Sequence, residues 1–160
     1  MSDPAAVGQE ADARGGGPGT LLSQLELRPP VALPPDATIS DAARAMMGAG
    51  VSAVVLAPGG AVITERDLVH ALASGLPPTA SAAAVASPEP LVVNEEASAL
   101  EALATMLRHG FRHLVVVDRA GRPRSLLTLS EAAAVVLGGV EVPPWLAGLR
   151  LALHVEMHVD

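Results

Sequence analysis

Residues 58–68 read PGGAVITERDL, which predicts a glycine turn, a short buried strand and a helix that begins at Thr64. Residues 121–132, GRPRSLLTLSEA, follow the same order. In each stretch a carboxylate, Asp67 or Glu131, stands three residues after the threonine that opens the helix. A helix N-terminus carries unpaired N–H groups and partial positive charge, so each of these two turns could receive an anion.

The regions before these two turns also correspond. Thr38 and Ser98 each precede an amphipathic helix and have an acidic residue three positions later, which is the pattern of a capping box. Gly50 and Gly110 supply the ends of these two helices. When the two glycines are aligned, a long apolar strand follows in both halves. The chain therefore contains an internal duplication of a β-α-β-β-α unit.

This duplication predicts an α+β fold in which two β-α-β-β-α repeats pack as a pseudo-symmetric pair. We expect the strands at 31–33, 51–56 and 61–63 in the first repeat, and at 90–93, 111–117 and 126–127 in the second. The predicted organisation is a disordered N-terminal tail over 1–20, repeats over 21–80 and 81–138, and a C-terminal extension over 139–160.

The C-terminal extension has a different pattern. From Arg150 onward apolar and polar residues alternate strictly, which predicts a short strand with one buried face. Its polar side contains His154, Glu156, His158 and Asp160. Zinc accepts histidine and carboxylate ligands, so a metal-dependent enzyme is one hypothesis for this segment. A solvent-facing strand side is the simpler interpretation.

Composition excludes several classes of protein. The 160 residues include no cysteine, no lysine and no tyrosine, and the formal net charge is −7. Thiol catalysis, Schiff-base chemistry and a phosphate-binding loop with its lysine are therefore ruled out. The negative charge argues against broad nucleic-acid binding. The sequence has no apolar run of membrane-spanning length and no signal-peptide pattern, so we expect a cytoplasmic protein. We also expect that the protein is not an enzyme.

The duplicated pattern resembles a tandem pair of CBS (cystathionine-β-synthase) domains, a Bateman module. The matching pieces are PDATISDAARAMM, GVSAVVL and VITERDL in the first repeat, and ALATMLRHGFRHLVVVD and LLTLSEA in the second. The resemblance implies a regulatory module without a catalytic cofactor. It implies an adenosine-containing ligand (AMP, ADP, ATP, S-adenosylmethionine or a dinucleotide) in a cleft between the repeats. A homodimer and a separate regulated protein partner are implied as well.

The resemblance also implies roles for particular residues. A threonine and the helix N-terminus meet a phosphate, a carboxylate binds the ribose hydroxyls, and the base lies against the long strand. The first site would use Ser52, Ala53, Thr64, Arg66 and Asp67, and the second site Arg112, His113, Thr128 and Glu131. The second site departs from the family pattern, because Glu131 replaces the usual aspartate and Ser130 stands where the first repeat has Arg66.

Two alternatives remain open at this level. The pairs Thr64 with Asp67 and Thr128 with Glu131 could be capping boxes and nothing more. The repeats could then form a ligand-free dimerisation scaffold.

The second repeat contains a cluster of arginines: Arg108, Arg112, Arg119, Arg122 and Arg124. We interpret the last three as solvated surface and Arg112 as a possible phosphate contact.

Overall fold

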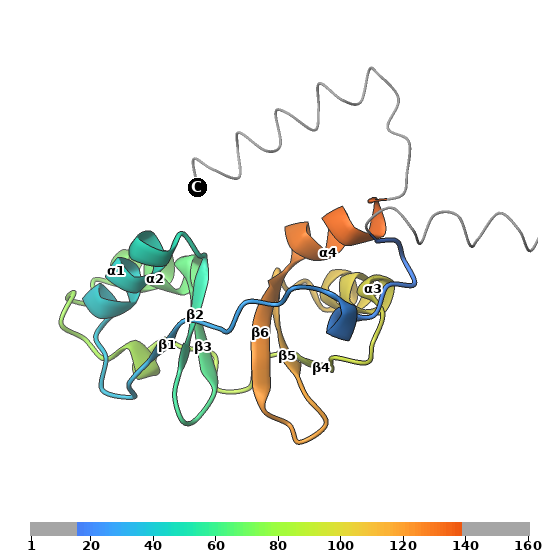
Figure 1. The fold of residues 1–160 in the computed structure, drawn as a ribbon. Helices are drawn as coiled ribbons and strands as arrows, with labels where there is room; N and C mark the ends of the chain where they lie inside the picture. Colours follow the sequence, from blue (N-terminus) through green and yellow to red (C-terminus); the bar gives the residue numbers. More distant parts are fainter. Residues whose placement is uncertain (1–15, 139–160) are drawn as a thin grey trace, which may run out of the picture.

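The computed structural model describes residues 16–138, which form two repeats side by side (Figure 1). The first repeat contains β1 (Ala32–Leu33), α1 (Ile39–Ala49), β2 (Ala53–Leu56), β3 (Ala61–Thr64) and α2 (Glu65–Ala73). The second contains β4 (Val92–Asn94), α3 (Ala99–His109), β5 (His113–Val117), β6 (Pro123–Thr128) and α4 (Leu129–Val136). The short 3-10 helix η3 (Leu22–Gln24) precedes the first repeat, and η4 (Ala82–Ala84) precedes the second. The α+β fold class and the duplicated order of elements are confirmed.

The two sheets have the same topology. In the first, β2 lies in the centre, parallel to β1 and antiparallel to β3. In the second, β5 is central, parallel to β4 and antiparallel to β6. The parallel pairs need a crossover connection, and α1 and α3 supply it.

All four α-helices of the described residues begin with a capping box, as the sequence predicts. The side chains of Thr38, Thr64, Ser98 and Thr128 each accept a hydrogen bond from the backbone N–H three residues later. The acidic side chain at that later position accepts the N–H of the cap residue in return. Helices α1 and α3 end at Gly50 and Gly110, whose φ angles of 65° and 69° lie in the left-handed region that glycine tolerates best.

Alternation along the strands divides the apolar residues between two kinds of core. In β2, Val54 and Leu56 pack toward the helices of their own repeat, and in β5 Leu114 and Val116 do the same. The residues between them face the other repeat, and they form a third cluster in which Ala53, Val55, Val62 and Val115 are buried. Since this cluster draws on both sheets, the repeats are joined through their sheets.

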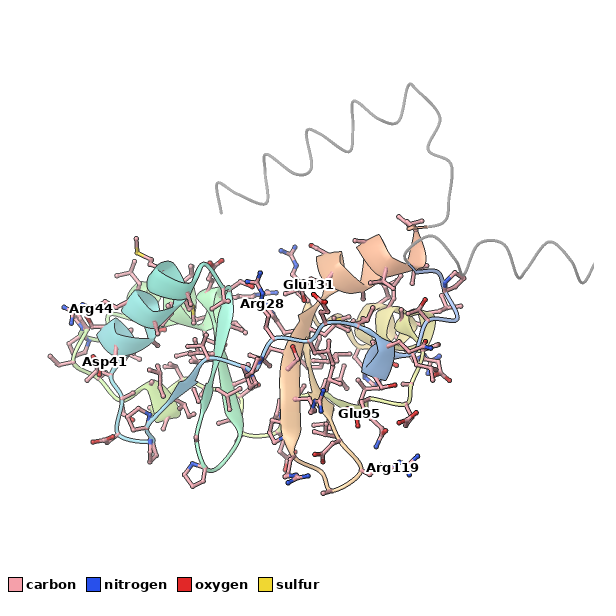
Figure 2. The ribbon with its side chains drawn as sticks, in the orientation of Figure 1. Arg28, Asp41, Arg44, Glu95, Arg119 and Glu131 are labelled. Atoms are coloured by element: carbon pink, nitrogen blue, oxygen red, sulfur yellow. The ribbon has the colours of Figure 1, made fainter. Side chains whose placement is uncertain are left out.

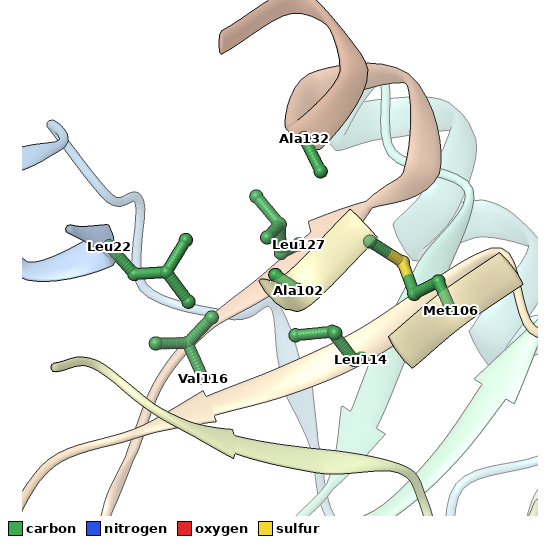
Figure 3. Packing of buried hydrophobic residues seen from close by; sticks show 7 residues of the cluster. All are labelled: Leu22, Ala102, Met106, Leu114, Val116, Leu127 and Ala132. Carbon is green, nitrogen blue, oxygen red and sulfur yellow. The ribbon is translucent and has the colours of Figure 1, made fainter. Parts of the chain in front are cut away.

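The segment that leads into each repeat packs against the other repeat. Leu22 is fully buried in the core of the second repeat, beside Val116 and Ala102 (Figure 3). Ala82 is likewise fully buried in the core of the first repeat. Backbone hydrogen bonds fix this exchange, because the N–H of Leu22 donates to the carbonyl of Ala97 and the N–H of Ala82 donates to that of Ala37, each at 2.9 Å.

The structure differs from the sequence prediction in several places, and β2, β4 and β5 each start two residues later than predicted. Residues 16–20, assigned to the disordered tail, are part of the packed structure, because the carbonyls of Pro18 and Thr20 accept N–H groups from the start of α3. Strand β6 is longer than the predicted 126–127, since pairing continues to Pro123 past an irregularity at Val116 and Val117. The rest of the tail and the C-terminal extension lie outside the described residues.

The predicted division into repeats at 21–80 and 81–138 remains a prediction, and the exchanged lead-in segments show why sequence boundaries and packing units differ. Within residues 16–138, no helix is both long and apolar enough to cross a membrane.

Candidate ligand-binding site

The two predicted sites are built on equivalent backbone positions. Ala53 at the start of β2 pairs with Thr64 at the end of β3, and His113 at the start of β5 pairs with Thr128 at the end of β6. The residue before each strand closes the turn. The carbonyl of Ser52 accepts the N–H of Glu65 at 3.0 Å, and that of Arg112 accepts the N–H of Leu129 at 2.8 Å. Strand start and helix start are therefore held together in both repeats.

Each helix start places a carboxylate beside its cap threonine. At α2, Asp67 Oδ2 accepts the N–H of Thr64 at 2.8 Å and the hydroxyl of Thr64 at 3.0 Å. At α4, Glu131 Oε2 accepts the N–H of Thr128 at 3.0 Å. Asp67 is half-buried and Glu131 is exposed. Figure 2 shows Glu131 at the start of α4, on the side of the second repeat that faces the first.

A direct side-chain contact joins the two predicted sites. Ser52 Oγ and His113 Nε2 lie 2.7 Å apart and share a hydrogen bond between the repeats. Both side chains are half-buried. Sequence reasoning assigned these residues to different sites and missed the contact, because no local pattern reports how two repeats pack together.

The surroundings of His113 combine burial with charges of both signs. Burial lowers the pKa of His113 below its ordinary value of 6.5, which keeps the ring neutral near pH 7. Glu131 and Asp67 oppose this by raising the pKa, while Arg112 adds to the lowering. Since carboxylates from both repeats act on the same ring, the helix starts of α2 and α4 face a common region.

The predicted arginines lie at the rim of this region. Arg66 in the first turn of α2 and Arg112 just before β5 are both exposed. Arg119, Arg122 and Arg124, which the sequence analysis interprets as solvated surface residues, lie at the surface. Arg119 is exposed, Arg122 pairs with Asp118 at 3.0 Å, and Arg124 lies 3.6 Å from Glu95 at the edge of the second sheet.

Of two surface hollows among residues 16–138, the smaller lies beside this region. One of about 230 Å³ is lined by Asp67, His70, Ala71, Ser74, Leu76 and Val85, so it borders the predicted ligand site at Asp67. Another of about 500 Å³ lies on the outer side of α3, around Asn94, Glu101 and Arg108, away from the predicted site residues. Among residues 16–138 no group of three or more metal-ligating side chains comes together. The four candidate metal ligands at 154–160 lie outside the described residues.

Fold and site together define a class of protein: a tandem pair of β-α-β-β-α repeats joined through their sheets, with a helix N-terminus and a carboxylate from each repeat beside the junction. Residues 22–74 and 82–138 match the family model of the CBS domain. The chain belongs to the CBS domain family, and the resemblance seen in the sequence is confirmed.

Relatives among known proteins agree with this assignment. A CBS domain-containing protein of Arabidopsis thaliana is 31% identical over 116 residues, which are 69% of this chain and 21% of that protein. The chain thus spans about a fifth of that relative's length. A CBS domain protein from Pyrobaculum aerophilum, solved in complex with AMP, is 28% identical with a TM-score of 0.63, covering 83% of this chain and 98% of that one.

A further solved structure shares the fold at lower identity. It is the CBS domain pair of a protein in complex with 5'-methylthioadenosine and S-adenosyl-L-methionine, with 19% identity and a TM-score of 0.68 over 78% of this chain and 100% of that one. At this identity the likeness concerns the fold alone.

Proposed function

We propose that this protein is a regulatory module that binds an adenosine-containing ligand between its two CBS repeats and passes the bound state to a partner protein. It acts by binding, without catalysis and without a required cofactor. The observation that carries the proposal is the pair of equivalent helix starts, each with a threonine, the positive end of a helix dipole and a carboxylate, brought to one junction. The AMP complex of the 28% identical relative supports an adenosine nucleotide as the ligand.

The chemistry of the junction suits the parts of such a ligand. The partial positive charge at the helix start attracts a phosphate, and the exposed Arg66 or Arg112 adds positive charge. Asp67 or Glu131 accepts hydrogen bonds from ribose hydroxyls. The strand starts at Ala53 and His113 lie beside the region where a base would stack.

The first site is the better candidate. Asp67 is half-buried and bonded to both the N–H and the hydroxyl of Thr64, so its carboxylate is held in one orientation. Arg66 directly precedes Asp67 on the same helix turn. In the second site the exposed Glu131 has one more rotatable bond, and Ser130 replaces the arginine. We therefore expect the first site to bind the ligand more tightly.

A thermal-shift screen of the full chain with AMP, ADP, ATP, S-adenosylmethionine and NAD tests this function. A ligand at a hundred times its Kd stabilises the folded state by about 2.7 kcal/mol, which raises Tm by about 5–10 °C in a protein of this size. GTP serves as the control for non-specific phosphate binding. If no adenosine compound raises Tm at millimolar concentration, the module is a ligand-free scaffold.

The helix surfaces support a second role, assembly into a homodimer. Several large apolar side chains on α1, α2 and α3 are exposed, including Met47 at 86%, Leu72 at 78% and Leu107 at 63%. Met47 and Leu107 occupy equivalent positions in the two repeats, so the exposed apolar surface repeats with the internal symmetry. A second copy of the chain would cover it. This assembly is compatible with ligand binding at the sheet junction, since the helices lie on the other side of each sheet (Figure 1).

A further inference from the structure

The hydrogen bond between Ser52 and His113 lies between the two predicted sites. Ser52 belongs to the first site, where its side chain is predicted to flank the base. His113 belongs to the second. In the 2.7 Å contact, a side chain of the first site and a side chain of the second site are hydrogen-bonded to each other.

The contact also occupies space. The imidazole of His113 extends from the start of β5 across the junction to the hydroxyl beside β2. A base placed against Ser52 would meet this ring. The ring is half-buried and its pKa is lowered by burial, so near pH 7 it is a neutral group held by the serine hydroxyl.

Resting on the proposed function, we infer that the Ser52–His113 hydrogen bond couples the two sites. A ligand entering the first site displaces the ring from Ser52, and a ligand engaging His113 in the second site breaks the same bond. The binding free energy of the first ligand is reduced by the cost of breaking this hydrogen bond. The second ligand binds after the bond is already broken and does not meet this cost. The two sites therefore bind with positive cooperativity, in which His113 acts as a positioning residue.

The size of the coupling follows from the bond that is lost. A hydrogen bond between uncharged groups in a protein corresponds to about a twofold to tenfold change in an equilibrium constant. Coupling is reciprocal, so each ligand strengthens the binding of the other by that factor.

Calorimetric titration of the full chain with AMP, and in parallel with ATP and S-adenosylmethionine, tests the inference. The variants are His113→Ala, Ser52→Ala and the double variant, with Ser23→Ala, an exposed serine on η3, as the control. We expect two ligands per wild-type chain. We expect the Hill coefficient to fall in either single variant without falling further in the double variant, and to stay at the wild-type value in Ser23→Ala. In His113→Ala the first ligand should bind about twofold to tenfold more tightly.

The outcomes separate this inference from the proposed function. If none of the three probes binds the wild type, the proposed function fails and the coupling fails with it. If a probe binds but its Hill coefficient is the same in wild type and variants, or only one molecule binds per chain, the coupling is overturned and ligand binding stands. Weaker binding of the first ligand in His113→Ala would also overturn it, because the ring would then hold that ligand instead of giving way to it. Thermal melts without ligand check that each variant is folded.

Discussion

Thr64 and Asp67 hold each other through three hydrogen bonds at the start of α2. The carboxylate accepts both the backbone N–H and the hydroxyl of Thr64, and the hydroxyl oxygen accepts the N–H of Asp67. Asp41 makes the corresponding box with Thr38 on α1, at the far edge of the first repeat from the junction (Figure 2). The two aspartates therefore differ in location more than in local bonding.

This matched pair separates a cap from a ligand contact. Asp67→Asn keeps an oxygen of the same reach but loses the charge. If Asp67 binds ribose hydroxyls, each charge-assisted hydrogen bond is worth about 1.5–3 kcal/mol, so the affinity for an adenosine ligand should fall at least tenfold. Asp41→Asn should leave affinity unchanged. Calorimetry of both variants makes the comparison, and equal affinities would reduce Asp67 to a helix cap.

His113 should make stability depend on pH in the window just below its ordinary pKa of 6.5. Because burial lowers its pKa in the folded state, the unfolded chain binds more protons in this window, and the free energy of unfolding falls as the pH falls below 6.5. Well above that pH neither state is protonated at this residue, and the contribution is constant. Melting His113→Asn and wild type from pH 8 to pH 5 should show a shallower loss in the variant.

The matched control for this measurement is His109→Asn, at the exposed end of α3. The lowered pKa of Asp41, held down by its bonds to Thr38, affects stability only as the pH falls below about 4, outside the window. Identical pH profiles for wild type and His113→Asn would contradict the assignment.

Exchange of the lead-in segments predicts a large effect at Leu22. This residue lies on η3, ahead of the first β-α-β-β-α unit, yet it is fully buried in the core of the second repeat. Leu22→Ala should destabilise the protein by about 2–5 kcal/mol, because it removes buried methyl groups and leaves a cavity. Chemical denaturation measures it. Leu100→Ala, at a position 48% exposed on α3, should lower stability far less.

The apolar helix surface predicts a dimer that charge can break. Light scattering of the wild type should give twice the chain mass at micromolar concentration. Met47→Glu and Leu72→Glu place a charge on the exposed apolar surface and should shift the protein to a monomer. Ala83→Glu on η4 provides a control at an exposed position away from the α-helices. A monomer mass for the wild type in light scattering would contradict the proposed homodimer.

Much of the fold could be predicted because its signals are local. Each capping box is readable from two residues three positions apart, and Gly50 and Gly110 mark helix ends by their backbone freedom. The duplication then gives each weak pattern a second, independent example. Strand β6 escaped full prediction because proline lacks the N–H of a strand ladder and Pro123 follows a glycine turn, while pairing with β5 extends the strand in the fold.

The candidate site could be predicted only in parts. The residues at each helix start were found one repeat at a time, but their joining depends on the cluster of Val55, Val62 and Val115 between the sheets. The sequence of an apolar strand does not indicate which other element its side chains pack against. For the same reason the contact of Ser52 with His113 and the exchange of Leu22 became visible only in three dimensions.

The exchanged lead-in segments also set an order for folding during synthesis. Leu22 leaves the ribosome long before α3 and β5, the elements that bury it, and the first repeat remains without Ala82 until the connecting segment has emerged. Neither half can complete its interior from its own continuous stretch of chain. A nascent chain arrested between the repeats would therefore expose unfinished apolar surface to chaperones and proteases, and the native state becomes available only once translation has passed the second repeat.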